Sequence, residues 1–106
     1  MNIKTKKSLG QNFLVDKNIL NKIVNTVNIS NKEILEVGPG SGNLTNYILK
    51  KKPKKFYVVE KDDNLSLLLK KKFNDKIKII NDDILKISKN KISKNKLIVF
   101  GNLPYN

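Results

Sequence analysis

Residues 33–42 constrain the fold more than any other part of the chain. Residues 33–37 form a short apolar stretch interrupted by Glu36, which predicts a buried β-strand. This stretch runs directly into the loop Gly38-Pro39-Gly40-Ser41-Gly42, and the residues after it predict a helix with one apolar side made by Leu44, Tyr47 and Ile48. The free N–H groups at such a helix N-terminus favour an anionic group, such as a phosphate or an amino-acid carboxylate. The segment therefore predicts a strand, loop and helix that bind a ligand, with a glycine turn that binds nothing as the alternative.

Two other segments have the spacing of amphipathic helices. Asp16 is a suitable N-cap for a helix that ends near residues 28–31 and whose apolar face is Ile19, Leu20, Ile23, Val24 and Val27. Asp62 or Asp63 opens another helix, with an aligned apolar face of Leu65, Leu68, Leu69 and Phe73. Both faces predict packing against a core.

Further short apolar runs predict strands at residues 56–60, 77–80 and 97–100. Strands that alternate with helices imply right-handed crossovers and the α/β class, with a doubly wound, mostly parallel sheet. About half of such a sheet is expected here, because the chain stops after the fourth strand.

Residues 87–91 and 92–96 repeat the same pentapeptide, Ile-Ser-Lys-Asn-Lys. A five-residue period fits neither a helix nor a strand, so we expect a duplication in a tolerant, solvated loop rather than a repeat architecture.

Acidic residues follow two of the predicted strands. In an open α/β sheet the ligand crevice lies beyond the carboxyl ends of the strands, and an acid after the second strand, here Glu60, is placed to accept hydrogen bonds from ribose hydroxyls. Nicotinamide dinucleotides and S-adenosylmethionine are the main candidate cofactors. The loop spacing G-x-G-x-G differs from the dinucleotide pattern G-x-G-x-x-G and favours the methyl donor. Asp83 would then lie near the adenine amino group, with a solvated turn acid as the alternative.

The amino-acid composition limits which kinds of site and partner the chain can have. The sequence has no cysteine and no histidine, so we expect neither a disulfide nor a metal centre. The formal net charge of +13 suggests a polyanionic partner, although every basic residue is lysine, which codon bias in an AT-rich genome would also produce. No apolar run is long enough to span a bilayer, and no signal or transit peptide is recognisable, which favours a cytoplasmic protein without membrane contact.

Five segments together resemble the ribosomal RNA adenine dimethyltransferase family, and they cover nearly the whole chain. They are Gly10-Gln11-Asn12-Phe13-Leu14, residues 36–45, Val59-Glu60, Asp82-Asp83 and Gly101-Asn102-Leu103-Pro104-Tyr105-Asn106. The resemblance implies a Rossmann-like class I methyltransferase fold that uses S-adenosylmethionine. Residues 1–15 would form a basic segment closing over the cofactor, and residues 16–106 the first part of the cofactor-binding domain. The later strands and a helical C-terminal domain are missing by this comparison, so we expect this piece alone to be inactive.

The resemblance also implies roles for individual residues. Asn12 and Leu14 would contact the cofactor, Gly38 its methionine part, Glu60 the ribose and Asp83 the adenine. Asn102 would serve both cofactor and target. The catalytic set would be Asn102, Leu103, Pro104 and Tyr105, in which an amide and a backbone carbonyl accept the amine hydrogens and the tyrosine stacks on a flipped base.

The expected reaction is N6-dimethylation of two adjacent adenines near the 3′ end of small-subunit ribosomal RNA, during ribosome biogenesis. The expected partner is that RNA or the pre-ribosomal small subunit, and the full-length enzyme is expected to be monomeric. Pro39 and Leu103 favour this branch over the related large-subunit methyltransferases that confer antibiotic resistance. A non-catalytic nucleic-acid-binding relative and a dinucleotide-dependent oxidoreductase are further alternatives.

Overall fold

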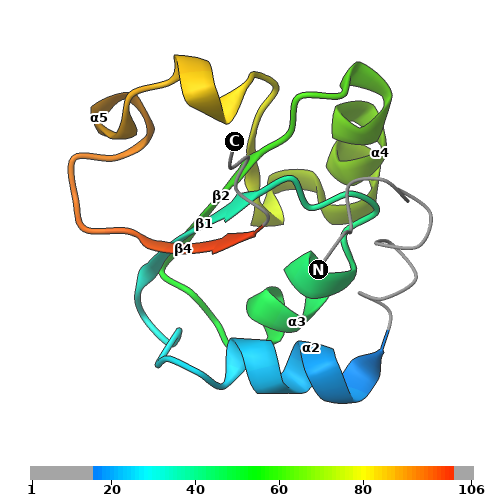
Figure 1. The fold of residues 1–106 in the computed structure, drawn as a ribbon, viewed down its shortest axis with the longest axis vertical. Coiled ribbons are helices and arrows are strands. Elements are labelled where there is room, and N and C mark those ends of the chain that lie inside the picture. The colour runs from blue at the N-terminus through cyan, green and yellow to red at the C-terminus, as the bar shows by residue number, and fades with distance from the viewer. Residues whose placement is uncertain (1–15, 102–106) are drawn as a thin grey trace.

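A computed structural model describes residues 16–101 of the chain, and these form a four-stranded parallel sheet in the order β3-β2-β1-β4 (Figure 1). The strands are β1 (Glu33–Val37), β2 (Lys55–Val59), β3 (Lys78–Ile80) and β4 (Ile98–Gly101). The helices are α2 (Lys17–Val24), α3 (Asn43–Lys50), α4 (Asp63–Phe73) and α5 (Lys89–Ile92), with short 3₁₀ turns η1 (Asn74–Lys76) and η2 (Ile84–Lys86). The predicted α/β class and parallel sheet are confirmed.

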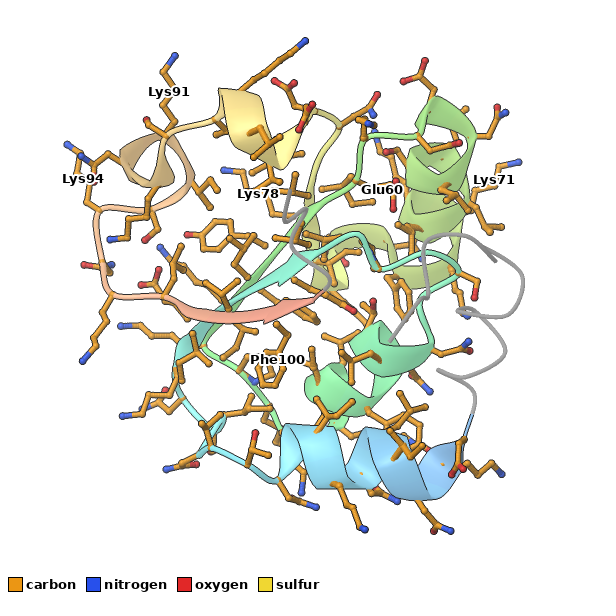
Figure 2. The ribbon with its side chains drawn as sticks, in the orientation of Figure 1. Glu60, Lys71, Lys78, Lys91, Lys94 and Phe100 are labelled. Carbon is orange, nitrogen blue, oxygen red and sulfur yellow. The ribbon has the colours of Figure 1, made fainter. Side chains whose placement is uncertain are left out.

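Each face of the sheet buries one apolar cluster. Successive side chains of a strand point to opposite faces, and Ile34, Phe56 and Val58 pack with α2, α3 and α4 on the first face. Phe100 points from β4 toward α3 within this cluster (Figure 2). Leu35 and Val59 pack on the second face, which η2 and α5 cover. Both faces are therefore covered, as expected for a doubly wound sheet.

The predicted helices form, but two of their apolar residues lie elsewhere than expected. Asp16 caps α2 by accepting hydrogen bonds from the N–H groups of Asn18 and Ile19. This helix ends at Val24, so Val27 lies beyond it and is exposed. In α4, Leu69 and Phe73 are buried four residues apart, whereas Leu68 is turned away from the sheet and is 47% exposed. Those two assignments to the core were wrong.

The tandem pentapeptide has two different structures. Ser88 and Asn90 of the first copy are exposed, as expected of a solvated segment, but Ile87 packs against the second apolar cluster and Lys89 begins helix α5. In the second copy Ile92 and Ser93 are buried, and Ser93 Oγ donates a hydrogen bond of 2.7 Å to Glu33 Oε1. Asn95 Nδ2 donates one of 2.6 Å to Glu33 Oε2. The prediction of a loop is wrong for residues 89–92, which form α5. The prediction of a solvated segment is wrong for the second copy, because these bonds tie it to the start of β1.

Candidate functional site

The carboxyl ends of the strands meet at one edge of the sheet, and the glycine-rich loop lies there. Val37 pairs with Val59 on one side and with Gly101 on the other. The Gly38 N–H donates to the Val59 carbonyl oxygen at 2.9 Å, and the Glu60 N–H donates to the Ile80 carbonyl oxygen at 3.0 Å. We call this the carboxyl edge, and it is where an open α/β sheet binds its ligand.

The glycine loop is anchored at one end and open at the other. Gly42 caps α3 with φ +92°, and a Cβ there would lie 2.7 Å from Phe73 Cε2, so this position requires glycine. Lys72 Nζ donates to the Ser41 carbonyl oxygen at 3.1 Å, which ties α4 to the loop. Among residues 16–101, no atom lies within 4 Å of where a Cβ on Gly38 or Gly40 would be. The loop thus has open space beside its backbone, which suits a ligand that approaches closely.

Strand β4 approaches β1 closely at this edge. Gly101 has φ +136°, and a Cβ there would lie 2.2 Å from the Val37 carbonyl oxygen. A glycine is therefore required where β4 reaches the carboxyl edge beside the loop.

Glu36 is a buried carboxyl group directly beneath the loop. It is 2% exposed, and one of its oxygens accepts a hydrogen bond from the Thr45 hydroxyl in the first turn of α3. The pKa of Glu36 is raised to about 7, mainly by burial. The Thr45 hydrogen bond opposes this rise, and the negative charge of Glu60 adds to it. The contact joins the end of β1 to α3 and so holds both ends of the glycine loop.

Glu60 follows β2 (Figure 2) and is held by several hydrogen bonds. Its Oε2 accepts the Asp62 N–H at 2.9 Å, which fixes the direction of the carboxylate. Its carbonyl oxygen accepts from Ser66 Oγ at 3.2 Å and from Asn81 Nδ2 at 3.0 Å. A carboxylate fixed in this way at a strand end is suited to binding a diol.

Asp83 is half-buried and follows β3. Its Oδ1 accepts the Leu85 N–H at 2.9 Å and caps η2, while its own N–H donates to Asp82 Oδ1 at 2.7 Å. The capping bond gives this residue a structural role besides the predicted contact with adenine.

The structure brings Gly38, Glu60 and Asp83 to the same edge, as predicted. Asn12, Leu14 and the set Asn102, Leu103, Pro104 and Tyr105 lie outside the described residues. The sequence patterns predict no role for Thr45, Lys72 or Asn81, which support the loop and Glu60. Asn81 directly follows a predicted strand, and this position could have indicated a place at the carboxyl edge. The contacts of Thr45 and Lys72 depend on tertiary packing.

Acidic side chains gather at the carboxyl edge. Five of the nine acidic residues follow β2 or β3, namely Glu60, Asp62, Asp63, Asp82 and Asp83. A concentration of negative charge opposes a pyrophosphate and favours a ligand with hydroxyl groups and a positive charge. The edge is thus suited to a cationic nucleoside more than to a dinucleotide.

Within residues 16–101, no group of three or more histidine, cysteine, aspartate or glutamate side chains is placed to hold a metal ion. Over the same residues, no helix combines the length and apolar character needed to cross a membrane.

Comparison with known proteins agrees with the geometry. The family described as Ribosomal RNA adenine dimethylase matches residues 2–106. Ribosomal RNA small subunit methyltransferase A from Pelagibacter ubique (strain HTCC1062) is 71% identical over all of this chain and 40% of that protein. The protein of the same name from Sulfurihydrogenibium sp. (strain YO3AOP1) is 41% identical over 98% of this chain and 42% of that protein. The chain therefore spans about two fifths of the length of these relatives.

Solved structures show the same fold. The structure of the 23S rRNA methyltransferase ErmE matches 85% of this chain and 36% of its own with a TM-score of 0.72 and 26% identity. A dimethyladenosine transferase from Plasmodium falciparum matches 85% of this chain and 33% of its own with a TM-score of 0.72 and 25% identity. The predicted Rossmann-like methyltransferase fold is confirmed.

Proposed function

Because this chain belongs to the ribosomal RNA adenine dimethylase family, we propose that it forms the S-adenosylmethionine-binding part of an enzyme that dimethylates N6 of two adjacent adenines near the 3′ end of small-subunit ribosomal RNA. Such an enzyme acts in ribosome biogenesis in the cytoplasm, on the RNA or the pre-ribosomal small subunit, as a monomer. The observation that carries the proposal is the 71% identity, over the whole chain, to a protein named for the small subunit. This identity favours the small-subunit branch over the 23S branch, with which the chain shares the fold at 26% identity.

The carboxyl edge supports S-adenosylmethionine as the cofactor. The open space at Gly38 would admit its methionine part, Glu60 would accept hydrogen bonds from the ribose hydroxyls, and Asp83 would face the adenine. Asn12 and Leu14 of the basic segment 1–15 would close over it. The cofactor supplies an activated methyl group on a sulfonium, whose positive charge suits this acidic edge.

The target amine requires orientation more than a strong base, because its lone pair is delocalised into the adenine ring. In our proposal Asn102 and the carbonyl oxygen of Leu103 accept its two hydrogens, so that the nitrogen becomes pyramidal and points at the methyl group. Tyr105 stacks on the flipped base and Pro104 stiffens the turn. After transfer the nitrogen is cationic and acidic, so its proton leaves to water, which agrees with a sequence without histidine.

Single-turnover methylation of small-subunit RNA tests the role of Asn102, in a protein of full family length that carries this chain. Asn102→Ala should lower the rate at saturating cofactor and RNA by about 10² or more, because a preorganised polar group is lost at the reacting centre. RNA affinity at fixed salt should change little, since it depends mainly on phosphate contacts. Asn90→Ala, at an exposed site in α5, is the matched control. An Asn102→Ala enzyme with the wild-type rate would refute the catalytic assignment.

A further inference from the structure

The amino ends of the strands carry the opposite charge from the carboxyl edge. Lysines precede β2 and β3 or lie at their first residues, among them Lys52, Lys54, Lys55, Lys76 and Lys78. Most acids next to the first three strands lie at the other edge; the exceptions are Glu33 at the start of β1 and Asp75 before β3, and Lys61 is a lysine at the carboxyl end of β2. Codon bias enriches lysine throughout a chain, but it does not separate lysines from acids on opposite edges of a sheet.

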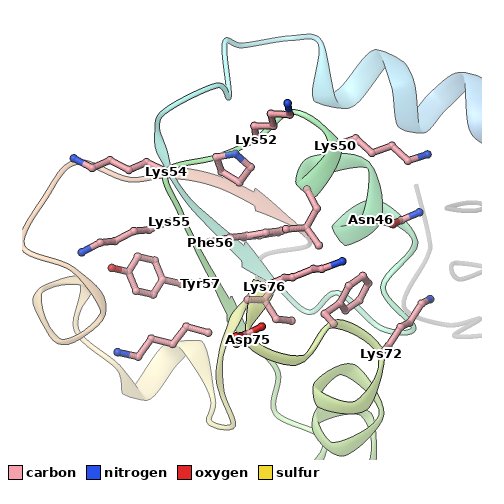
Figure 3. A pocket seen from close by; sticks show the side chains of 15 residues that line it. Asn46, Lys50, Lys52, Lys54, Lys55, Phe56, Tyr57, Lys72, Asp75 and Lys76 are labelled. Carbon is pink, nitrogen blue, oxygen red and sulfur yellow. The ribbon is translucent and has the colours of Figure 1, made fainter.

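A groove of about 930 Å³ opens among these lysines (Figure 3). It lies between the C-terminal ends of α3 and α4 and the starts of β2 and β3, and its lysines are Lys50, Lys52, Lys54, Lys55, Lys76 and Lys78. Lys72 also lines the groove. Among the described residues that line the groove, Asp75 is the acidic one. We call this the lysine groove.

Local structure accounts for only some of these lysines. Lys50 and Lys72 lie in the last turns of α3 and α4, where a cation stabilises the helix dipole. Lys50 Nζ also lies 5.0 Å from the centre of the Tyr47 ring, and Lys72 Nζ is bonded to Ser41. Lys54, Lys55 and Lys78 lie outside the helices and are exposed. Their gathering around one groove therefore indicates a polyanionic partner.

We propose that the lysine groove binds the phosphate backbone of a ribosomal RNA segment other than the one that supplies the target adenine. This inference rests on the proposed function, which places the target at the carboxyl edge. Strand β1 has five residues and separates the two edges by about 17 Å at roughly 3.3 Å per residue. Phosphates in the groove therefore belong to other nucleotides than the flipped base, and their binding positions the enzyme on its substrate without touching the reacting atoms.

The shape and composition of the groove favour RNA over an anionic membrane. A protein that lies on a membrane surface inserts exposed apolar side chains among the lipid head groups. The large apolar residues that are exposed in residues 16–101 are Val27, Leu67, Leu68, Leu85 and Val99, and none of them lines the groove. The aromatic residues Phe56, Tyr57 and Phe73 form its buried walls instead. Exposed lysines around a groove with buried apolar walls suit a phosphate chain.

Charge-neutralising variants of equal size test the inference in a protein of full family length. The groove variant carries Lys54→Gln, Lys76→Gln and Lys78→Gln. The control carries Lys22→Gln, Lys70→Gln and Lys71→Gln, at exposed sites on α2 and α4 outside the groove; Lys71 projects from α4 (Figure 2). Two probes are used: small-subunit particles that lack the methyl groups, and an isolated hairpin that contains the two adenines.

The groove variant should bind the particle about tenfold or more weakly at low salt, and its slope of log affinity against log salt should fall by about 2–3. Its affinity for the hairpin and its single-turnover rate at saturating particle should equal those of the control. Equal particle affinities for both variants would overturn the inference. So would tighter binding of the wild type to vesicles of anionic lipid than to the particle, if the groove variant loses that vesicle binding and the control keeps it. A wild-type protein that methylates neither RNA would instead refute the proposed function.

Discussion

The two ends of β1 each bury one glutamate, and their surroundings shift the two pKa values in opposite directions. Glu33 begins the strand and is 6% exposed, whereas Glu36 lies beneath the glycine loop and is 2% exposed. Each accepts a hydrogen bond from a hydroxyl group, that of Ser93 for Glu33 and that of Thr45 for Glu36. The hydrogen bond from Ser93 is the main cause that lowers the pKa of Glu33. Burial acts in the opposite direction, whereas the hydrogen bond from Asn95 and the charges of two nearby lysines, Lys55 and Lys54, lower the pKa further. Burial, with repulsion from Glu60, raises that of Glu36 to about 7.

The difference follows mainly from hydrogen bonding and burial, and the separation of charge across the sheet adds to it. At the amino edge, two hydrogen-bond donors and, to a smaller extent, two nearby lysines stabilise a carboxylate in a mostly buried position. At the carboxyl edge, burial and, to a smaller extent, the charge of a second acid make a negative charge on Glu36 costly, so that the proton is retained up to about neutral pH. One edge thus accommodates negative groups and the other accommodates positive ones, in agreement with an RNA backbone at the first and a sulfonium cofactor at the second.

The largest expected effect is on the pH dependence of stability through Glu36. Its pKa rises from 4.5 to about 7 on folding, so the folded state binds more protons than the unfolded state between these values. Its contribution is fully favourable below pH 4.5 and is lost as the pH rises through 7. At 1.36 kcal/mol per pKa unit the loss is about 3 kcal/mol.

Urea unfolding of wild type and Glu36→Gln from pH 4 to pH 8 measures this loss. Glutamine keeps the oxygen that accepts from Thr45 but does not titrate, so it should gain about 3 kcal/mol relative to wild type over this range. A difference between the two proteins that stays constant with pH would show that folding leaves the pKa of Glu36 unchanged, which would contradict this prediction.

A smaller effect is expected at the other end of the strand. Ser93→Ala removes the hydroxyl that donates to Glu33 and should lower the Tm at pH 7 by a few degrees. Ser88→Ala changes the same position of the first pentapeptide, where the serine is exposed, and should have little effect. Equal losses for the two serines would contradict the anchoring role of the second copy.

The pH dependence at Glu33 has the opposite sign. Because its pKa is lowered on folding, its contribution is present above its unfolded value of 4.5 and is lost as the pH falls through the folded value. The Tm difference between wild type and Ser93→Ala should therefore shrink between pH 7 and pH 3. Thermal unfolding at several pH values checks this, and a difference that widens in acid would contradict the comparison.

Local patterns were sufficient to predict the strands, the parallel sheet and the placement of the loop, Glu60 and Asp83. These features depend on the alternation of strands with helices and on the rule that parallel strands end at one edge. The role of the second pentapeptide was not predictable, because identical residues are buried or exposed according to what they meet in the fold. The predicted burial of Val27 and Leu68 was wrong for a related reason. Periodicity predicts which face of a helix is apolar, but not where the helix ends or how much of that face the sheet covers. Likewise, the net charge can be counted from the sequence, but how lysines and acids divide between the two edges of the sheet depends on the topology.

Titration of S-adenosylmethionine into a full-length protein by calorimetry tests whether the carboxyl edge binds the cofactor and the amino edge does not. Glu60→Ala should weaken binding by about 1–3 kcal/mol, because two ribose hydroxyls lose a charged acceptor. The triple groove variant Lys54→Gln, Lys76→Gln and Lys78→Gln should bind the cofactor as wild type does. Unchanged affinity in Glu60→Ala, or tighter binding of NADH than of the methyl donor by the wild type, would contradict the account.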